Sequence, residues 1–391
     1  MKGNRSMETL RFIHASDFHL DAPFRGGRPG YGQLRRQDVR RAFSATMDHA
    51  MAEQAGLVLL CGDLFEQDGV TRDTVAFLRR ELNRLSGAHV LLLPGNHDPY
   101  TTDSWYRAVE WPAHVHLLTA EPGHAAVLDL PEIGVFAAGF GFSAHRQDPP
   151  DFATLPPPAT DRFNLLLVHG TLDMPVGEMQ YNPVTSAQLA QTGYDYAAFG
   201  HFHKPFEFPG KPHVANPGSP EPLGFDEPGE HGILSCTLER RDDVVSVRTR
   251  TLSVSSRTYV ERQVDLTACE SPDACKLALA GALSDCTPER HLPHVRLAGT
   301  PLEPPDVEAL AEWFGGDWLL FRLTDETRPP LEWETALAHE SLTGRFCRNL
   351  AARMAEAEAA GDPERVEVLR RARQMGLEAL AYGTVHVPPE R

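Results

Sequence analysis

Five short apolar runs, each ending in polar residues, set the pattern of the first half of the chain. They read RFIHASDFH, LVLLCGD, VLLLPGNHD, FNLLLVHG and YDYAAFGHFH, and begin at residues 11, 57, 90, 163 and 194. Continuous apolar runs of this length are typical of strands that are buried on both faces of a sheet. We therefore expect five inner strands, each followed directly by side chains that can carry chemistry.

Helical patterns separate these runs. Residues 71–85 place apolar side chains at 75, 78, 82 and 85, which is the helix period, and residues 38–55 are also expected to be helical. Alternating strands and helices predict an α/β layered domain. In such sheets ligands bind beyond the carboxyl ends of the strands, and every polar cluster falls there.

The predicted secondary structure changes in character twice along the rest of the chain. A proline-rich loop (148–161) and a turn-rich segment (216–232) belong to the first domain, predicted at 8–250. Residues 256–330 read as a small α+β module of three strands and a helix, with Ser271 as N-cap and Pro272 in the first turn. Residues 331–391 are expected to be helical, and Asp362 and Pro363 begin the second of two helices.

Composition restricts the class of protein. A chain of 391 residues is too long for one ordinary core, and 41% apolar with 23% charged residues is typical of globular proteins. It contains no run of eighteen apolar residues and no signal-peptide pattern, so we expect a cytoplasmic protein with no membrane contact. The six cysteines form no CxxC pair, which argues against a zinc knuckle or a disulfide framework.

The net charge of −17 argues against a nucleic-acid partner. A local basic patch can override the total charge, and RRQDVRR (35–41), with Arg25 and Arg28 nearby, is a candidate patch. A solvated helix face is the alternative interpretation of that run.

Seven side chains at the strand ends are of the types that bind metal ions. A dinuclear site needs about this number of ligands, one of which must bridge the ions. Imidazole and carboxylate together suit Mn, Fe or Zn better than Ca or Mg. Each short motif taken alone is weak evidence for a metal site. All of them together, in order and each at the end of a predicted strand, would rarely arise by chance. The seven are Asp17, His19, Asp63, Asn96, His169, His201 and His203. His14 has the wrong parity on its strand and is expected in the core.

The series DFH, GDLFE, GNHD, VHG and GHFH, spread over residues 11–203, resembles the calcineurin-like metallophosphoesterase superfamily. FIHASDFHLDAPF and CGDLFEQDG resemble its DNA-repair exonuclease branch, the bacterial SbcD and YhaO-type proteins and their archaeal and eukaryotic break-repair counterparts. The resemblance implies a sandwich of two sheets flanked by helices, a small α+β capping domain and a helical C-terminal tail.

The resemblance also assigns roles. Asp17, His19 and His203 would hold one metal ion, and Asn96, His169 and His201 a second. Asp63 would bridge the two ions. His97 would act on the phosphate as general acid or transition-state stabiliser, with Asp98 orienting it. The branch often has Asp where Glu66 stands, which affects only the support around Asp63. Apart from these roles, the basic patch offers Arg25, Arg28, Arg35 and Arg36 as contacts to DNA if they line one groove. Ser219 is a further candidate, in the loop NPGSPEPLGFDE, which resembles the PGS loop of the branch.

The function implied is that of a Mn-dependent DNA nuclease subunit with two divalent ions. Its partners would be DNA, an SbcC-like coiled-coil ATPase of the SMC type and, by family analogy, a second copy of the chain. One alternative is another metallophosphoesterase, a protein phosphatase or a cyclic-nucleotide phosphodiesterase. Protein phosphatases carry GNHE and an Arg soon after their GD motif, whereas this chain has GNHD and GDLFEQDG. A structural subunit with an inactive site is the other alternative, and the complete ligand set argues against it.

Overall fold

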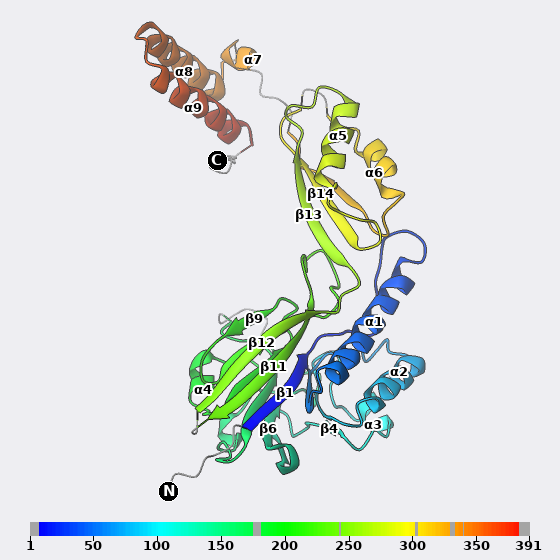
Figure 1. The fold of residues 1–391 in the computed structure, drawn as a ribbon. Helices are drawn as coiled ribbons and strands as arrows, with labels where there is room; N and C mark the ends of the chain where they lie inside the picture. Colours follow the sequence, from blue (N-terminus) through cyan, green and yellow to red (C-terminus); the bar gives the residue numbers. More distant parts are fainter. Residues whose placement is uncertain are drawn as a thin grey trace. The chain divides into compact units, whose positions relative to one another are not determined.

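The computed structural model describes residues 8–174, 181–241, 244–301, 304–328, 333–338 and 340–382. These residues form two compact units that interleave along the sequence (Figure 1). The first unit holds the described chain up to Glu261 together with residues 286–294 and 314–322. The second holds residues 262–285 and 295–313 and the described chain from Leu323 onward.

The first unit contains two six-stranded sheets in its described part. The first sheet has four parallel strands, β1 to β4, extended at the β1 edge by β11 and β12, which run antiparallel. Its order is β12 (Val244–Ser253), β11 (Gly232–Arg241), β1 (Glu8–Ala15), β2 (Leu57–Cys61), β3 (His89–Leu93) and β4 (Val115–Leu117).

The second sheet has four parallel strands, β6, β7, β8 and β10, with an antiparallel strand at each edge. Its order is β5 (Ala126–Leu130), β6 (Val135–Phe140), β7 (Phe163–His169), β8 (Tyr196–Gly200), β10 (His213–Asn216) and β9 (Phe206–Phe208). The segments that connect the strands of the two sheets contain two 3₁₀ turns and two short helices. These are the turns Pro131–Ile133 and Phe152–Thr154 and the helices α3 (Trp105–Ala108) and α4 (Ser186–Ala190).

Alternation along the buried strands builds the layers. On β2, Leu57 and Leu59 face the second sheet, where they pack in one core with Leu165 of β7. Val58 and Leu60 belong to the core on the other face, under the helices. Figure 1 shows α1 and α2 side by side outside the first sheet. The predicted two-sheet sandwich flanked by helices is confirmed.

The two long helices of this unit test the helix predictions. α2 (Arg72–Asn83) lies within the predicted range, and Thr71 caps it by accepting a hydrogen bond from the Thr74 amide at 3.2 Å. α1 (Tyr31–Ala52) begins well before the predicted residue 38. Its early buried positions include the charged Arg35 and Asp38, so the apolar period does not reveal its first turns.

The smaller three-stranded sheet has the order β13 (Thr258–Asp265), β14 (His291–Ala298) and β15 (Arg322–Asp325), with helices α5 (Pro272–Ala282) and α6 (Val307–Gly315). The Ser271 hydroxyl accepts a hydrogen bond from the Ala274 amide at 3.2 Å, which confirms the predicted cap of α5. The sequence pattern did not predict α6.

The C-terminal region folds as α7 (Trp333–Ala338), α8 (Leu342–Ala359) and α9 (Pro363–Tyr382). Ser341 caps α8 through the Gly344 amide, so the expected first helix is divided. α9 begins at Pro363 as predicted, and α8 packs on α9, where a Cβ at Gly376 would collide with the Phe346 ring. None of the helices in the described ranges combines the length and the apolar content that a membrane span requires.

Candidate metal centre

The carboxyl ends of five strands meet at one edge of the sandwich. The segments after β1 and β2 run side by side there, because the Asp17 amide donates to the Gly62 carbonyl at 3.0 Å and the His19 amide to the Asp63 carbonyl at 2.9 Å. Asp17, His19 and Asp63 have φ values of 56°, 49° and 51°, and His201 has 94°. Left-handed backbone at non-glycine residues costs about 1–3 kcal/mol each and is typical of functional sites.

Two glycines allow the close approach of these segments. A Cβ at Gly95 would collide with the side chain of Asp63, and a Cβ at Gly62 would collide with the ring of His169. Gly62 also has a φ of 86°, which favours glycine. The glycines of the GD and GNHD motifs therefore make room for the side chains at the centre.

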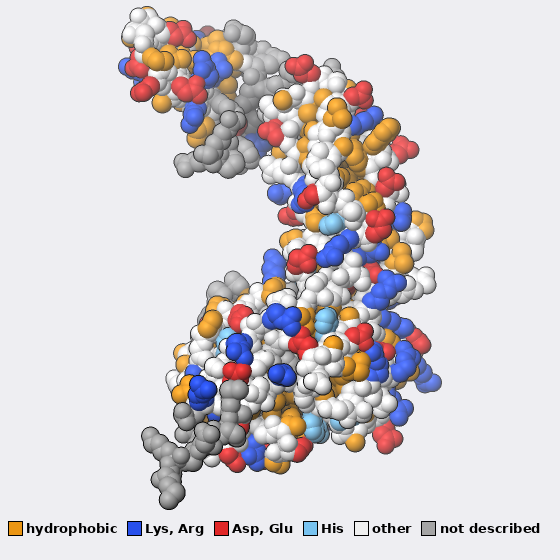
Figure 2. All heavy atoms as spheres, in the orientation of Figure 1, with side chains coloured by type: hydrophobic (Ala, Val, Ile, Leu, Met, Phe, Trp, Pro, Cys, Tyr) orange, Lys and Arg blue, Asp and Glu red, His pale blue; other side chains and the backbone are white. Residues whose placement is uncertain are grey.

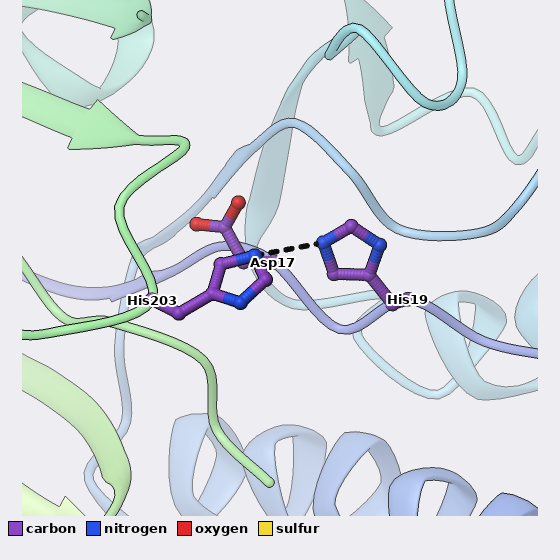
Figure 3. Close-up of side chains that lie close together, drawn as sticks. All are labelled: Asp17, His19 and His203. Carbon is purple, nitrogen blue, oxygen red and sulfur yellow. Dashed lines mark hydrogen bonds between the residues drawn. The ribbon is translucent and has the colours of Figure 1, made fainter. Parts of the chain in front are cut away.

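The first donor cluster combines Asp17, His19 and His203, whose ligand atoms lie within 4.8 Å of one another (Figure 3). His19 Nε2 and His203 Nε2 are 3.1 Å apart. Two imidazole nitrogens that bind one ion at about 2.0–2.1 Å in tetrahedral geometry lie about 3.3 Å apart. The spacing of these two nitrogens therefore fits a shared cation.

The second donor cluster combines Asp63, His169 and His201 within the same limit. Asn96 adds an amide oxygen, since its Oδ1 lies 3.0 Å from His169 Nε2 and 3.0 Å from His201 Nδ1. Asp63 lies between the two clusters. Its Oδ2 is 3.6 Å from His19 Nε2 and 3.2 Å from His169 Nε2. The structure thus brings all seven predicted ligands together, and an Asp63 oxygen lies within 3.6 Å of a donor atom of each cluster.

Charges inside this buried site also fit cations. Burial alone would raise the pKa of Asp63, but the charges of His169 and His19 outweigh it and hold that pKa well below its usual range. Burial opposes protonation of His169 and His203, yet the Asp63 carboxylate raises the pKa of His169 to about 9, and Glu227 raises that of His203 to about 9. Without a metal ion, protons on these imidazoles balance the buried carboxylates, and divalent cations could replace them.

Three of the histidines are held by their second ring nitrogen. His19 Nδ1 donates to Glu66 at 2.7 Å, and His169 Nδ1 donates to the Cys61 carbonyl at 2.8 Å. His203 Nδ1 donates to Glu227 at 2.6 Å. Each bond leaves Nε2 free to face the centre, as ligating histidines require. The sequence analysis did not identify Glu227, because no spacing links it to His203.

His97 stands at the rim of the site. Its side chain is 45% exposed, and its Nδ1 donates to Glu66 at 2.9 Å, a hydrogen bond that raises the pKa of His97. Asp98 is fully buried. Contrary to the prediction, none of the hydrogen bonds of its carboxylate in the described chain goes to the His97 ring. Its carboxylate accepts hydrogen bonds from the amides of Asp63, Leu64 and Gly95 and from the Tyr106 hydroxyl. The structure gives the orienting role to Glu66, while Asp98 ties the GD and GNHD loops together.

The residues predicted to contact DNA divide into two groups. Arg25 and Arg28 are exposed and Arg36 is half-buried. Arg35 is fully buried and pairs with Asp38 and Glu221. Ser219 is also buried. The predictions for Arg35 and Ser219 are therefore wrong, because neither side chain reaches the surface.

A two-sheet sandwich with two adjoining nitrogen and oxygen donor clusters at its strand ends defines the class of metallophosphoesterases. The sequence profile of the calcineurin-like phosphoesterase family matches residues 10–205, half of the chain. The chain belongs to this family.

Several curated proteins resemble the chain. It is 30% identical over 253 residues to the uncharacterized metallophosphoesterase YhaO of Bacillus subtilis, covering 60% of this chain and 61% of that protein. It is 27% identical to the DNA double-strand break repair protein Mre11 of Aeropyrum pernix, covering 56% and 55%. It is 24% identical to the SbcD subunit of the nuclease SbcCD of Escherichia coli, covering 56% and 63%. The chain thus spans less than two thirds of each relative's length.

Proposed function

We propose that the protein is a two-metal phosphodiesterase that cleaves DNA. The observation that carries this proposal is the position of Asp63 between two donor clusters, with the half-exposed His97 at their rim. Such a site suits a phosphate ester, which needs positive charge on its oxygens and a proton donor for the leaving group.

The residues of the chain divide the chemistry. The two ligand sets would hold two divalent ions of the Mn, Fe or Zn type, with Mn as our proposal. These ions would supply positive charge for the phosphate and lower the pKa of a water molecule. His97 would donate its Nε2 proton to the leaving oxygen, since Glu66 holds Nδ1 and favours the protonated ring. Asp98 would keep His97 and Asp63 in fixed positions relative to each other, because its carboxylate accepts hydrogen bonds from the two loops that carry them.

DNA as substrate is supported by the names of two relatives, a DNA double-strand break repair protein and a nuclease subunit. It is also supported by charge. Figure 2 shows Lys and Arg side chains gathered over α1 and α2 on a protein whose net charge is −17. The exposed or half-exposed arginines of these helices are Arg36, Arg40, Arg41, Arg72, Arg79 and Arg80. Arg25 and Arg28 precede α1, and cleavage should weaken with salt if these side chains bind phosphates.

An SMC-type ATPase of the SbcC kind and a second copy of the chain are the proposed protein partners. The relative from Escherichia coli is by its name one subunit of a nuclease complex, which supports the first of these. The α7–α9 region offers apolar side chains for such an interaction, as argued below.

The test is hydrolysis by the purified protein with added Mn²⁺ on three substrates: end-labelled single-stranded DNA, a phosphomonoester and a cyclic nucleotide. We expect Mn-dependent cleavage of DNA that chelation abolishes and that Asp63→Asn lacks. Turnover of only the other two substrates would identify a different metallophosphoesterase. No turnover of any substrate by a protein that binds metal would support a structural role.

A further inference from the structure

We propose that Glu227 is a positioning residue that fixes the ring of the metal ligand His203, and that the loop from Ser219 to Glu227, here the 219–227 loop, is built to hold it. This inference concerns the same site and rests on the proposed function only in treating His203 as a ligand. It assigns a different role to a segment whose sequence was interpreted as contacting DNA through Ser219.

The contact between the two side chains is short, and its carboxylate is buried while the His203 side chain is 28% exposed. Glu227 Oε1 accepts a hydrogen bond from His203 Nδ1 at 2.6 Å, and the Glu227 residue is 3% exposed. With Nδ1 committed to the carboxylate, His203 must turn Nε2 toward His19 Nε2, 3.1 Å away. Figure 3 shows the two rings meeting beside Asp17. The carboxylate thus selects both the tautomer and the rotation of the ring.

The second carboxylate oxygen of Glu227 is also fixed by hydrogen bonds. Its Oε2 accepts from the Ser219 hydroxyl at 2.6 Å and from the Leu223 amide at 3.0 Å. The His231 ring lies between the Ser219 carbonyl at 2.7 Å and the Glu227 carbonyl at 3.1 Å, and so joins the two ends of the loop. With both oxygens engaged, the carboxylate cannot swing away from His203 without breaking buried hydrogen bonds.

The middle of the loop is anchored to two other elements of the first unit. Arg35 of α1 pairs with Glu221 at 2.5 Å and donates to the Pro222 carbonyl at 2.7 Å. The Tyr259 hydroxyl of β13 donates to the Leu223 carbonyl at 3.3 Å, and the Phe225 ring packs on Tyr259. Arg35, a residue expected to bind DNA, therefore has a structural task. Arg35 anchors the 219–227 loop, and Glu227 of that loop contacts the proposed metal ligand His203.

Because removing such a partner of a ligating histidine typically lowers metal affinity about 10–100-fold, the effect can be measured without a substrate. The experiment is isothermal titration of the full-length metal-free protein with Mn²⁺ alone. For Glu227→Gln we expect one of the two binding events to weaken by about 10–100-fold, while the event at the other donor cluster is retained. Ser219→Ala, which removes one hydrogen bond to the carboxylate, should give a smaller loss at the same event.

A matched control separates positioning from general stability. Glu207 Oε1 lies 2.7 Å from His213 Nε2, a pair of the same type whose histidine is at the amino end of β10. Glu207→Gln should leave both Mn²⁺ events unchanged. The metal-free melting temperature, measured for all variants, should show that Glu227→Gln remains folded at the temperature of the titration.

Two results would overturn the proposal. In the first, Glu227→Gln binds two Mn²⁺ ions as the original chain does. In the second, it loses both events together with a large drop in the metal-free melting temperature, which would make the loop merely structural. A chain that binds two ions and cleaves no DNA would refute the proposed function but leave this inference standing. A chain that binds no Mn²⁺ would refute both.

Discussion

At the scale of single residues, position decides what chemically identical groups do. Asp63 and Asp98 are both buried aspartates within one site. The neighbouring charges of His169 and His19 keep Asp63 ionised, whereas burial and the charge of Asp63 raise the pKa of Asp98 to about 6. Asp63 is therefore suited to bind cations, and Asp98 to accept hydrogen bonds from the backbone.

Asp63→Asn should lose both metal ions. The change removes a carboxylate that lies near donor atoms of both clusters, at 3.6 Å from His19 Nε2 and 3.2 Å from His169 Nε2. Elemental analysis of the Mn-loaded and desalted variant measures the loss. Asp103→Asn, at an exposed position, is the control. Full metal content in Asp63→Asn would show that this residue is not the bridge.

His97→Ala should keep both ions and lose turnover by roughly 10²–10⁴-fold, the usual contribution of a positioned acid. The reason is that the His97 ring points to Glu66 and the rim, whereas its backbone amide alone contacts Asp63, at 2.8 Å. Metal content and the rate of DNA cleavage are measured together. Glu66→Gln should also lower the rate, but it should weaken metal binding as well, because the Glu66 carboxylate accepts hydrogen bonds from both His97 and the ligand His19.

If His97→Ala loses metal, His97 belongs to the ligand set and the proton donor must be sought elsewhere. If the rate is unchanged, the leaving group needs no acid from this position.

At the scale of elements, one histidine joins the two sheets of the sandwich. His14 of β1 donates from Nε2 to the Phe199 carbonyl of β8 at 2.9 Å, and its Nδ1 accepts from the Tyr196 hydroxyl at 2.9 Å. The neutral ring satisfies both partners. Burial, opposed in part by the bond to Phe199, lowers the pKa of His14 to about 3.

This shift predicts a pH-dependent contribution to stability. His14 titrates near 6.5 in the unfolded chain and near 3 in the folded one, so its neutral form stabilises the fold above pH 6.5. The contribution is lost as the pH falls from 6.5 toward 3, at about 1.4 kcal/mol per pH unit. In urea unfolding of the metal-free protein at pH 7 and pH 5, His14→Gln should therefore lose less stability on acidification than the original chain.

His124→Gln, at an exposed histidine, controls for the change in charge and should follow the original chain. Equal acid sensitivity in all three proteins would mean that the folded pKa of His14 is not depressed.

At the scale of the whole molecule, the metal centre and the C-terminal helices are separate in sequence and in task. Every candidate ligand lies in the first unit, whereas α8 and α9 belong to the second. The seam between these helices buries Cys347, Leu350 and Leu377. Leu342, Val368 and Met375 remain exposed at 72%, 65% and 41%, and Val368 and Met375 are seven residues apart on α9. That spacing places them on one face of the helix, open to a partner.

Deleting residues 331–391 should leave Mn-dependent cleavage of short single-stranded DNA intact and abolish co-purification with the proposed ATPase. Val368→Asp combined with Met375→Asp in the full-length chain should reproduce the loss of the partner without removing a helix. Co-expression followed by affinity capture measures both. Capture of the ATPase at full strength by the truncated chain would refute the docking role and leave α8 and α9 as local packing.

The two-sheet sandwich was expected from the resemblance to the metallophosphoesterase family, whereas the sequence pattern by itself determined the five inner strands and the seven residues at their ends. The physical reason is that these features depend on local order. An apolar run makes a buried strand, and the residues at its end must lie at the carboxyl edge, as His169 at the end of β7 and Asp63 two residues after β2 show.

The tertiary structure alone decided which side chains support the site and which are lost to the interior. Glu227 follows His203 by 24 residues, Glu66 and His19 are 47 apart, and Glu221 and Arg35 are 186 apart. Hydrogen bonds and burial between such distant residues arise only when loops from different elements meet. A basic run can thus place Arg35 inside the protein, because its charge is satisfied there by the neighbouring Asp38 together with the distant Glu221, which the local sequence does not contain.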